Sequence, residues 1–210
     1  MKIIKPYYII ETSIISEEEI LVFIEKAGRT AYKSEDRITS DSAKKFIASI
    51  IKSGHESVIE HFTISVRFIC DRGVLQELAR HRIASFTVES SRYCNYSKDK
   101  FNREITVIEP FFWKRDSIQY LLWKEHCEDA ELTYIALLEE GATPEQARSV
   151  LPNSLKTEVF QTMNLREWRH FLKLRTSKRA HPQMRELVIP LLREFQSEFP
   201  TFFGDIIIEE

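Results

Sequence analysis

The chain has 210 residues, 43% of them hydrophobic and 30% charged, with a formal net charge of −2. This balance is typical of a globular protein with its own core and excludes a disordered chain. Because only 5 glycines are present, a Gly-rich dinucleotide-binding loop is not expected, and the 3 cysteines form no C-x-x-C pair of the kind found in zinc sites. With no signal-peptide pattern and no membrane-spanning apolar run, we expect a cytoplasmic protein with one domain over residues 1–210.

Apolar spacing and capping residues predict a mixture of helices and strands. Ser16, Thr143 and Asn164 each stand where an N-cap is expected, and Gln146 completes a capping box with Thr143. The expected elements, in chain order, are a helix over 17–26, a helix from Ser40 or Asp41 to Gly54, a strand over 62–70, a short helix over 73–82, a strand over 105–108, a long helix over 116–140, a short helix from Pro144, a strand over 159–163, a helix over 164–175 and a helix from Pro182 onward. Because these elements show no regular βαβ alternation, we predict the α+β class: a small mixed or antiparallel sheet flanked by helices, one of them a long central helix.

Basic residues concentrate in one segment of this nearly neutral chain. Between Asn164 and Arg185 only Glu167 opposes Arg166, Arg169, Lys173, Arg175, Lys178, Arg179 and Arg185. A local basic surface suits a phosphorylated small ligand better than long nucleic acid, which usually needs a basic domain.

The densest group of candidate functional residues lies between 80 and 93. It begins Arg80-His81-Arg82, continues through seven residues to Ser90, and ends with Arg92-Tyr93. Arginine forks match phosphate oxygens, and loop hydroxyl and backbone N–H groups can complete a phosphate cradle. The pattern R-H-R, seven residues, then S resembles the signature of the flavin-dependent thymidylate synthases.

Three further segments resemble this family, in the family's order. Residues 54–61 read Gly-His-Glu-Ser-Val-Ile-Glu-His, similar to its G-H-E-[ST]-x-x-E-H segment. Residues 147–152 are similar to its A-R-x-x-L-P segment. Residues 164–166 and 172–175 look like its N-x-R and F-x-x-L-R region. The resemblance therefore extends through most of the chain.

The resemblance implies an enzyme that methylates dUMP to dTMP. In the family, 5,10-methylenetetrahydrofolate supplies the carbon, and FAD, which NADPH reduces, supplies the hydride. It also implies a homotetramer whose sites are shared between subunits, with no metal, no nucleic acid and no membrane as partner. FAD is not held on a Rossmann domain in this family, which is consistent with the low glycine content.

The resemblance also assigns roles to individual residues. Arg175 matches the arginine that places a cation at the pyrimidine edge, and is the expected catalytic residue. The positions that match dUMP contacts are Glu77, Arg80, Glu89, Ser90, Ser91, Arg92, Arg148 and Arg175. The positions that match FAD contacts are His55, Ser57, Arg80, His81, Arg82, Val88, Asn164, Arg166 and His170.

Some positions depart from the family's pattern. Glu77 stands where glutamine is usual, and His170 stands where asparagine is frequent. The usual glutamate lies two residues before the serine, whereas Glu89 immediately precedes Ser90. Either Val88 contributes through its backbone or the loop shifts locally.

The sequence also allows other functions. A nucleic-acid-binding module would use the basic segments Arg80–Arg92 and Arg166–Arg185. A hydrolase or ribonuclease would use His55, His61 or His81 as acid and base. A metal site at His55 and His61 is not expected, because their spacing matches no common ligand pattern. Cys94 is expected to be a structural thiol, not a nucleophile.

Overall fold

The computed structural model describes residues 1–13 and 16–209, and the chain divides into two compact units. The first unit comprises Met1–Tyr7, Arg67–Arg80 and Phe86–Phe160. The second unit comprises Tyr8–Val66, His81–Ser85 and Gln161–Glu210. Both units contain helices and strand residues, so the predicted α+β class is confirmed. The signature segment contributes residues to both units, since the division falls after Arg80 and again after Ser85.

Four strands with residues in both units form a sheet in the order β2-β3-β6-β4. The strands are β2 (Tyr7–Ile10), β3 (Thr63–Asp71), β4 (Ala84–Val88) and β6 (Lys156–Asn164). Buried residues alternate with partly exposed ones along β6 and the first part of β3, as expected for strands with one face in a core. β6 is longer than predicted, while β2 and β4 are additions to the predicted strands.

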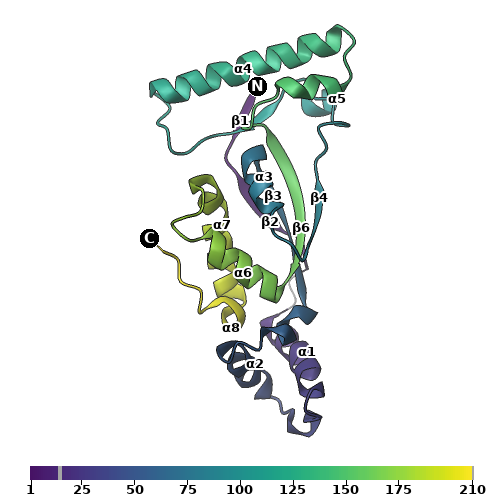
Figure 1. Ribbon diagram of the computed structural model, residues 1–210, viewed down its shortest axis with the longest axis vertical. Helices are drawn as coiled ribbons and strands as arrows, with labels where there is room; N and C mark the ends of the chain where they lie inside the picture. Colours follow the sequence, from purple (N-terminus) through teal and green to yellow (C-terminus); the bar gives the residue numbers. More distant parts are fainter. Residues whose placement is uncertain (14–15, 210) are drawn as a thin grey trace. The chain divides into compact units, whose positions relative to one another are not determined.

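The first unit is built around a long helix and a two-stranded pair. Its remaining elements are β1 (Lys2–Ile4), α3 (Arg72–Leu78), η3 (Asp99–Phe101), β5 (Thr106–Ile108), α4 (Ile118–Glu139), α5 (Pro144–Ala147) and η4 (Arg148–Val150). β1 pairs with β5 in parallel, with Lys2 opposite Thr106. α4 packs against α5 (Figure 1). It also packs against η4, and its Cys127 and Tyr134 are fully buried in a cluster with Val107.

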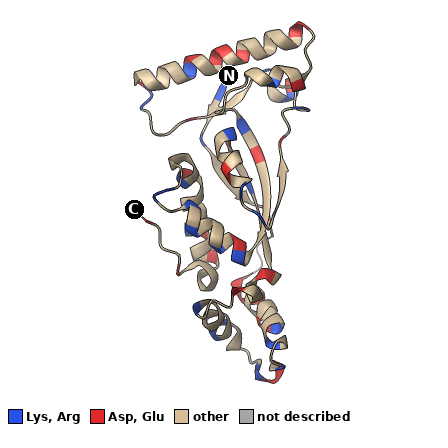
Figure 2. Ribbon diagram, in the orientation of Figure 1, with Lys and Arg blue, Asp and Glu red and all other residues tan. Residues whose placement is uncertain are grey.

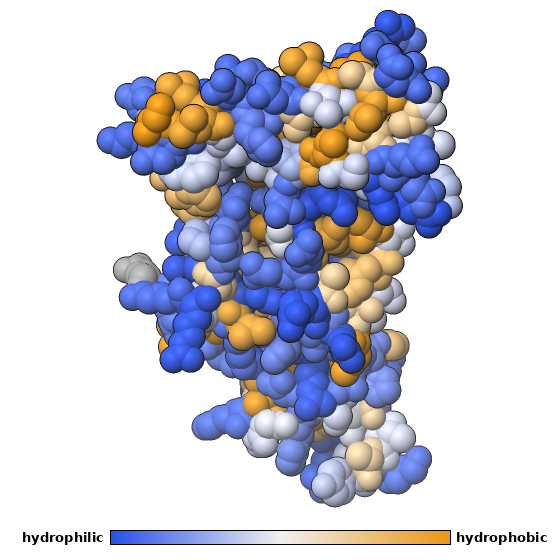
Figure 3. All heavy atoms as spheres, turned by 45° about the horizontal axis from the view of Figure 1, so that its top comes forward, coloured by the Kyte–Doolittle hydropathy of each residue, from blue (hydrophilic) through white to orange (hydrophobic). Residues whose placement is uncertain are grey.

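The predicted long helix is confirmed as α4, but its apolar residues do not all face the core. Leu121, Leu122 and Leu132 are 49%, 59% and 66% exposed. Figure 3 shows hydrophobic patches on the surface of this helix. α4 therefore buries one face and leaves Ile118, Leu121 and Leu122 exposed at its start, while exposed Glu125, Glu128 and Asp129 separate them from Leu132.

The second unit consists mainly of helices around an aromatic core. They are α1 (Glu17–Thr30), η1 (Glu35–Arg37), α2 (Ser42–Lys52), η2 (Glu56–His61), α6 (Leu165–Arg175), α7 (Pro182–Glu198) and α8 (Pro200–Phe203). α1 packs against α2, and α6 against α7 (Figure 1). Trp168 of α6 is completely buried against Phe171 and Phe195, and its indole N–H donates to the Ile64 carbonyl oxygen at 2.9 Å. Because aromatic side chains bury large apolar areas, this cluster fixes the position of α6 within the unit.

The predicted caps account for the starts of three helices. The Ser16 hydroxyl accepts from the Glu19 N–H and Thr143 forms a complete capping box with Gln146. The Asn164 side chain accepts from the Glu167 N–H at 2.9 Å and begins α6. One predicted boundary is wrong: α3 begins at the Asp71 cap and ends at Leu78, not at Arg82.

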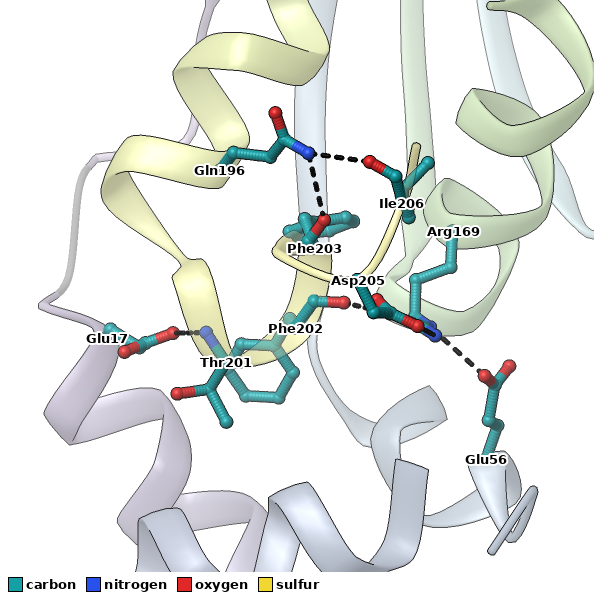
Figure 4. Close-up of polar contacts among 9 residues, drawn as sticks. All are labelled: Glu17, Glu56, Arg169, Gln196, Thr201, Phe202, Phe203, Asp205 and Ile206. Carbon is teal, nitrogen blue, oxygen red and sulfur yellow. Dashed lines mark hydrogen bonds and ion pairs between the residues drawn. The ribbon is translucent and has the colours of Figure 1, made fainter. Parts of the chain in front are cut away.

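The expected basic surface between 164 and 185 is smaller than predicted, because Arg169 points inward. Arg169 is only 1% exposed and forms ion pairs with Glu56 and Asp205. Its guanidinium also donates to the Phe202 carbonyl oxygen (Figure 4). Figure 2 shows acidic as well as basic residues on α6. The Arg169 guanidinium thus links α6 to η2 and to the C-terminal segment through ion pairs, and contributes little to the basic surface.

Within residues 1–13 and 16–209, no helix combines the length and apolar character needed to cross a membrane.

Candidate active site

The signature segment changes conformation sharply after α3. Arg80 and Arg82 are exposed, whereas His81 between them is only 6% exposed. Ile83 has φ 65 and is 78% exposed. A β-branched residue in the left-handed region is strained, and such strain concentrates at functional sites. The segment is therefore held in an unfavourable conformation immediately beside its buried histidine.

His81 lies against α6 in the second unit. The Arg175 Nε donates to His81 Nε2 at 2.8 Å, and the imidazole packs edge-on against Phe171, with 4.8 Å between ring centroids. Burial, together with the charges of Arg175 and His170, lowers the pKa of His81 to about 4. His81 is therefore neutral near pH 7 and accepts a hydrogen bond from the predicted catalytic arginine.

Two further polar residues of α6 surround the same histidine. Glu167 Oε1 lies 3.6 Å from His81 Nδ1, and the His170 ring centroid lies 6.1 Å from that of His81. Burial raises the pKa of Glu167, while His170 and Arg166 act in the opposite direction. His170, where the family often has asparagine, is exposed next to this group.

Possible ligand atoms of His81, Glu167 and His170 lie within 4.8 Å of one another, a composition that suits a transition metal. Arg175, however, already donates to His81 Nε2 and places a cation beside the three residues. A divalent ion there would face a fixed positive charge, so we assign this cluster to hydrogen bonding and electrostatics.

The other residues matched to FAD form a polar, largely exposed set in the second unit. Arg166 donates to Glu60 at 2.6 Å and remains 52% exposed. His55, Ser57 and Arg82 are exposed, and Asn164 uses its side-chain oxygen to cap α6. Two exposed guanidinium groups with a hydroxyl and an imidazole form a donor set that fits the pyrophosphate of a dinucleotide. The two remaining FAD candidates, Arg80 and Val88, lie in the first unit.

In the first unit, Glu89 belongs to a chain of alternating charges. It accepts hydrogen bonds from Lys156 at 2.8 Å and from the Tyr96 hydroxyl at 3.0 Å. Lys156 also donates to Glu158 at 2.6 Å, and Arg67 lies 3.5 Å from Glu158. Burial opposes the charge on Lys156, but the hydrogen bonds to Glu158 and Glu89 raise its pKa overall. The carboxylate next to Ser90 is therefore engaged within the protein.

The serines of the signature form a tight turn beside Arg148. The Ser90 carbonyl oxygen accepts from the Tyr93 and Cys94 N–H groups, and the Arg148 Nη1 donates to the Ser91 hydroxyl at 3.4 Å. Arg92 forms an exposed ion pair with Glu145 at 3.0 Å. The turn thus places the Ser90 hydroxyl and two guanidinium groups close together, as a phosphate site requires, while Ser91 is only 5% exposed and accepts from Arg148. The other two dUMP candidates of this unit are Glu77 at the end of α3 and the exposed Arg80.

A cavity of about 510 Å³ opens beside this turn within the first unit. Its lining is Arg67, Thr87, Val88, Glu89, Cys94, Phe101, Lys156, Glu158 and Phe160. The volume falls in the usual range for small-molecule sites. Val88 and Glu89 line this cavity, which agrees with the prediction that this part of the signature contacts a ligand.

The structure thus describes two groups of predicted residues, one in each unit. Glu77, Arg80, Val88, Glu89, Ser90, Ser91, Arg92 and Arg148 belong to the first unit. His55, Ser57, His81, Arg82, Asn164, Arg166, His170 and Arg175 belong to the second unit. The sequence analysis did not predict that Lys156 and Glu167 belong to these groups. Glu167 could have been found from its spacing, since 167, 170, 171 and 175 share one face of a helix.

A solved structure shares this fold. The UMP/dUMP methylase PolB from Streptomyces cacaoi, solved with bound 5-Br dUMP, superposes with a TM-score of 0.77 at 23% identity, over 97% of this chain and 96% of that one. At this identity the likeness establishes the fold alone: an α+β fold of the type found in that methylase.

Sequence comparison then gives the family. The flavin-dependent thymidylate synthase of Pyrococcus furiosus is 37% identical over 169 residues, covering 80% of this chain and 68% of that protein. The enzyme of the same name from Geobacter sulfurreducens is 35% identical over 187 residues, covering 85% and 78%. The family described as thymidylate synthase complementing protein matches residues 14–201. The chain belongs to this family.

Proposed function

We propose that the chain is a flavin-dependent thymidylate synthase that methylates dUMP at the C5 position of its uracil. In overall balance, dUMP, 5,10-methylenetetrahydrofolate, NADPH and a proton give dTMP, tetrahydrofolate and NADP⁺. Family membership supports this reaction. The hydrogen bond between Arg175 and His81 is the observation that supports the assignment of individual residues to it. That bond joins the R-H-R signature to the arginine expected to act on the pyrimidine.

The chemistry of Arg175 follows from its charge. Uracil C5 is a weak nucleophile, and it becomes a stronger one when negative charge develops at the N3–O4 edge of the ring. A guanidinium at that edge stabilises such charge, because its donors are preorganised and always cationic. We assign this role to Arg175, with His81 holding its Nε.

FAD is the proposed cofactor, and the polar residues of the second unit suit it. Arg82 and Arg166 would contact the pyrophosphate, with His55, Ser57, Asn164 and His170 available as further polar contacts. Bound FAD supplies the hydride that completes the methyl group. The protein's own part is to hold the cofactor and to exclude water from the reacting atoms.

The turn in the first unit is the proposed site for the dUMP phosphate. Ser90 and Ser91 offer hydroxyls, while Arg92 and Arg148 offer cations. The adjacent cavity has room for a nucleoside, and Lys156 keeps the carboxylate of Glu89 paired. Glu77 and Arg80 are assigned to the same ligand by their match to the family.

We further propose that the protein is a cytoplasmic homotetramer. In each chain, residues 1–210 would form a single catalytic domain. The exposed apolar group Ile118, Leu121 and Leu122 at the start of α4 supports association, because soluble monomers rarely leave contiguous apolar surface uncovered. Free Cys70, Cys94 and Cys127 are compatible with a reducing compartment.

The alternative functions have less support. A nucleic-acid-binding module would use the basic segment Arg166–Arg185 as a surface, yet Arg169 in that segment is buried in ion pairs with Glu56 and Asp205. A hydrolase that uses His81 as a base needs its Nε2 lone pair, which Arg175 occupies.

The test begins with the purified protein saturated with FAD and desalted. Anaerobic NADPH should bleach the flavin band, and addition of dUMP and methylenetetrahydrofolate should yield dTMP. If flavin is retained but no dTMP forms, the synthase assignment is wrong. If no flavin is retained and NADPH oxidation is not accelerated, the cofactor assignment is wrong as well.

A further inference from the structure

The hydrogen bond between Arg175 and His81 depends on where His81 carries its proton. Arg175 Nε is always a donor, so His81 Nε2 must offer a lone pair to accept at 2.8 Å. A neutral imidazole with its proton on Nδ1 meets this condition. The imidazolium and the Nε2–H tautomer both fail, because each would place an N–H against the Arg175 N–H. Only one of the three states of His81 therefore supports the observed geometry.

Glu167 faces the nitrogen that must carry the proton. Its Oε1 lies 3.6 Å from Nδ1, on the opposite side of the ring from Arg175. This separation exceeds a good hydrogen bond, so the interaction is electrostatic: an oxygen acceptor favours a proton on the nitrogen that it faces. Glu167 is 13% exposed and His81 4% exposed at their side chains, so solvent screens the interaction little.

Among residues 1–13 and 16–209, the remaining neighbours of His81 hold the ring without supplying an alternative acceptor at Nδ1. Phe171 packs edge-on against the imidazole, and the charge of His170 disfavours a second proton on it. Burial and the neighbouring charges together lower the pKa of His81 to about 4, so the imidazolium is scarce at neutral pH. The choice that remains is between the two neutral tautomers, and Glu167 biases that choice.

We propose that Glu167 is a positioning residue for the methylation reaction: it keeps the His81 proton on Nδ1, so that Nε2 accepts from Arg175 and holds the guanidinium in place. This inference rests on the proposed function, since it assumes that Arg175 acts on the pyrimidine. Glu167 itself need not touch substrate or flavin.

Glu167 also has a simpler structural role, and the test must distinguish it from the proposed effect on the His81 tautomer. It is the third residue of α6, and an acidic side chain in the first turn stabilises a helix by itself. Glu19 is the matched control, because it is the third residue of α1 in the same unit and completes the Ser16 capping box. Among the described residues, the Glu19 side chain makes hydrogen bonds only to Ser16.

The experiment compares Glu167→Ala, Glu167→Gln and Glu19→Ala in the full-length protein. In Glu167→Ala we expect kcat to fall roughly tenfold with the KM for dUMP and the Kd for FAD changed less, because an orienting group is lost and the contacting groups remain. Glu167→Gln retains an oxygen acceptor without the charge and should recover most of kcat. Glu19→Ala should keep wild-type kcat despite a lower Tm.

A second readout does not involve activity. In flavin-free protein labelled with ¹⁵N-histidine, the two ring-nitrogen shifts of His81, assigned by loss of its signals in His81→Asn, report its tautomer. We expect the Nδ1–H form in wild type and Glu167→Gln, and a mixture of tautomers in Glu167→Ala.

Wild-type kcat in Glu167→Ala, equal losses in the Gln and Ala variants, or an unchanged tautomer in Glu167→Ala would each overturn the inference. Failure of the wild-type protein to make dTMP would instead overturn the proposed function. The two failures are distinguishable, because the nitrogen shifts are measured without substrate.

Discussion

Asp205 accepts two hydrogen bonds from the guanidinium of Arg169, at 2.6 Å from Nη1 and 2.7 Å from Nη2 (Figure 4). Arg169 is buried, whereas the Asp205 side chain is 52% exposed. The planar fork of arginine matches a carboxylate in this way, and the pairing fixes direction as well as distance. The C-terminal segment is thereby tied to α6, the helix that also carries Arg175.

Removal of this carboxylate should destabilise the second unit. We expect Asp205→Ala to lower the free energy of unfolding by about 1–2 kcal/mol, less than for a fully buried pair because Asp205 is half exposed and Glu56 remains. Urea unfolding measures the change, and Asp36→Ala, at an exposed acidic residue in η1, is the control. The hydrogen bond from Arg169 lowers the pKa of Asp205, so the difference from wild type should persist above about pH 4 and shrink as pH falls through the folded-state pKa. A difference that grows on acidification would contradict the pairing.

Arg175→Ala should abolish dTMP formation and leave FAD binding largely intact. The reason is that the guanidinium acts on the pyrimidine, while the proposed flavin contacts come from other residues. Arg175→Lys should also lose most activity, because an ammonium lacks the Nε donor that His81 accepts. Flavin absorbance after desalting and a dUMP-to-dTMP assay provide the two measurements, with exposed Lys178→Ala as control. Wild-type turnover in Arg175→Ala would remove the catalytic assignment.

Lys156→Met should weaken dUMP binding. Without its ammonium, Glu89 and Glu158 become two less compensated carboxylates in the cavity of the first unit, and they would repel the substrate phosphate. We expect the KM for dUMP to rise roughly tenfold at low ionic strength and less at high salt, where such repulsion is screened. Steady-state kinetics at two salt concentrations test this. An equal rise at both would indicate a packing defect.

The depressed pKa of His81 predicts how stability depends on pH. Because the folded value is about 4 and the unfolded value 6.5, the unfolded chain binds more protons between these limits. The contribution of His81 is therefore fully present above about pH 6.5 and is lost as pH falls toward 4, by up to about 3 kcal/mol. His81→Gln should flatten the pH dependence of urea unfolding between pH 4.5 and 7. A profile as steep as wild type would mean that other groups dominate.

The fold was predictable where the sequence has local signals. Ser16, Thr143 and Asn164 begin helices because their side chains bond to N–H groups three residues on, which is visible in one short window. β4 has no such signal: its residues alternate between partly buried and exposed, and none is fully buried. Its place in the sheet depends on β6, far away in the sequence.

The residues of the candidate site could be predicted from the sequence, but the contacts between them could not. The family pattern identifies His81 and Arg175, yet no local feature indicates that one accepts a hydrogen bond from the other. The burial of Arg169 was missed for the same reason, since Asp205 lies 36 residues away in the chain. Long-range pairs of charged residues are set by tertiary packing, which a single sequence does not reveal.

Cys94 lines the cavity of the first unit, so the reactivity of its thiol can report whether that cavity is occupied. Burial, assisted by Glu89, raises the pKa of its thiol, and Cys70 and Cys127 are completely buried. Alkylation of the native protein at neutral pH should therefore be slow, and Cys94 should react first. A ligand that fills the cavity would slow it further, so the rate of modification by iodoacetamide can report occupancy without a chromophore, a radiolabel or turnover.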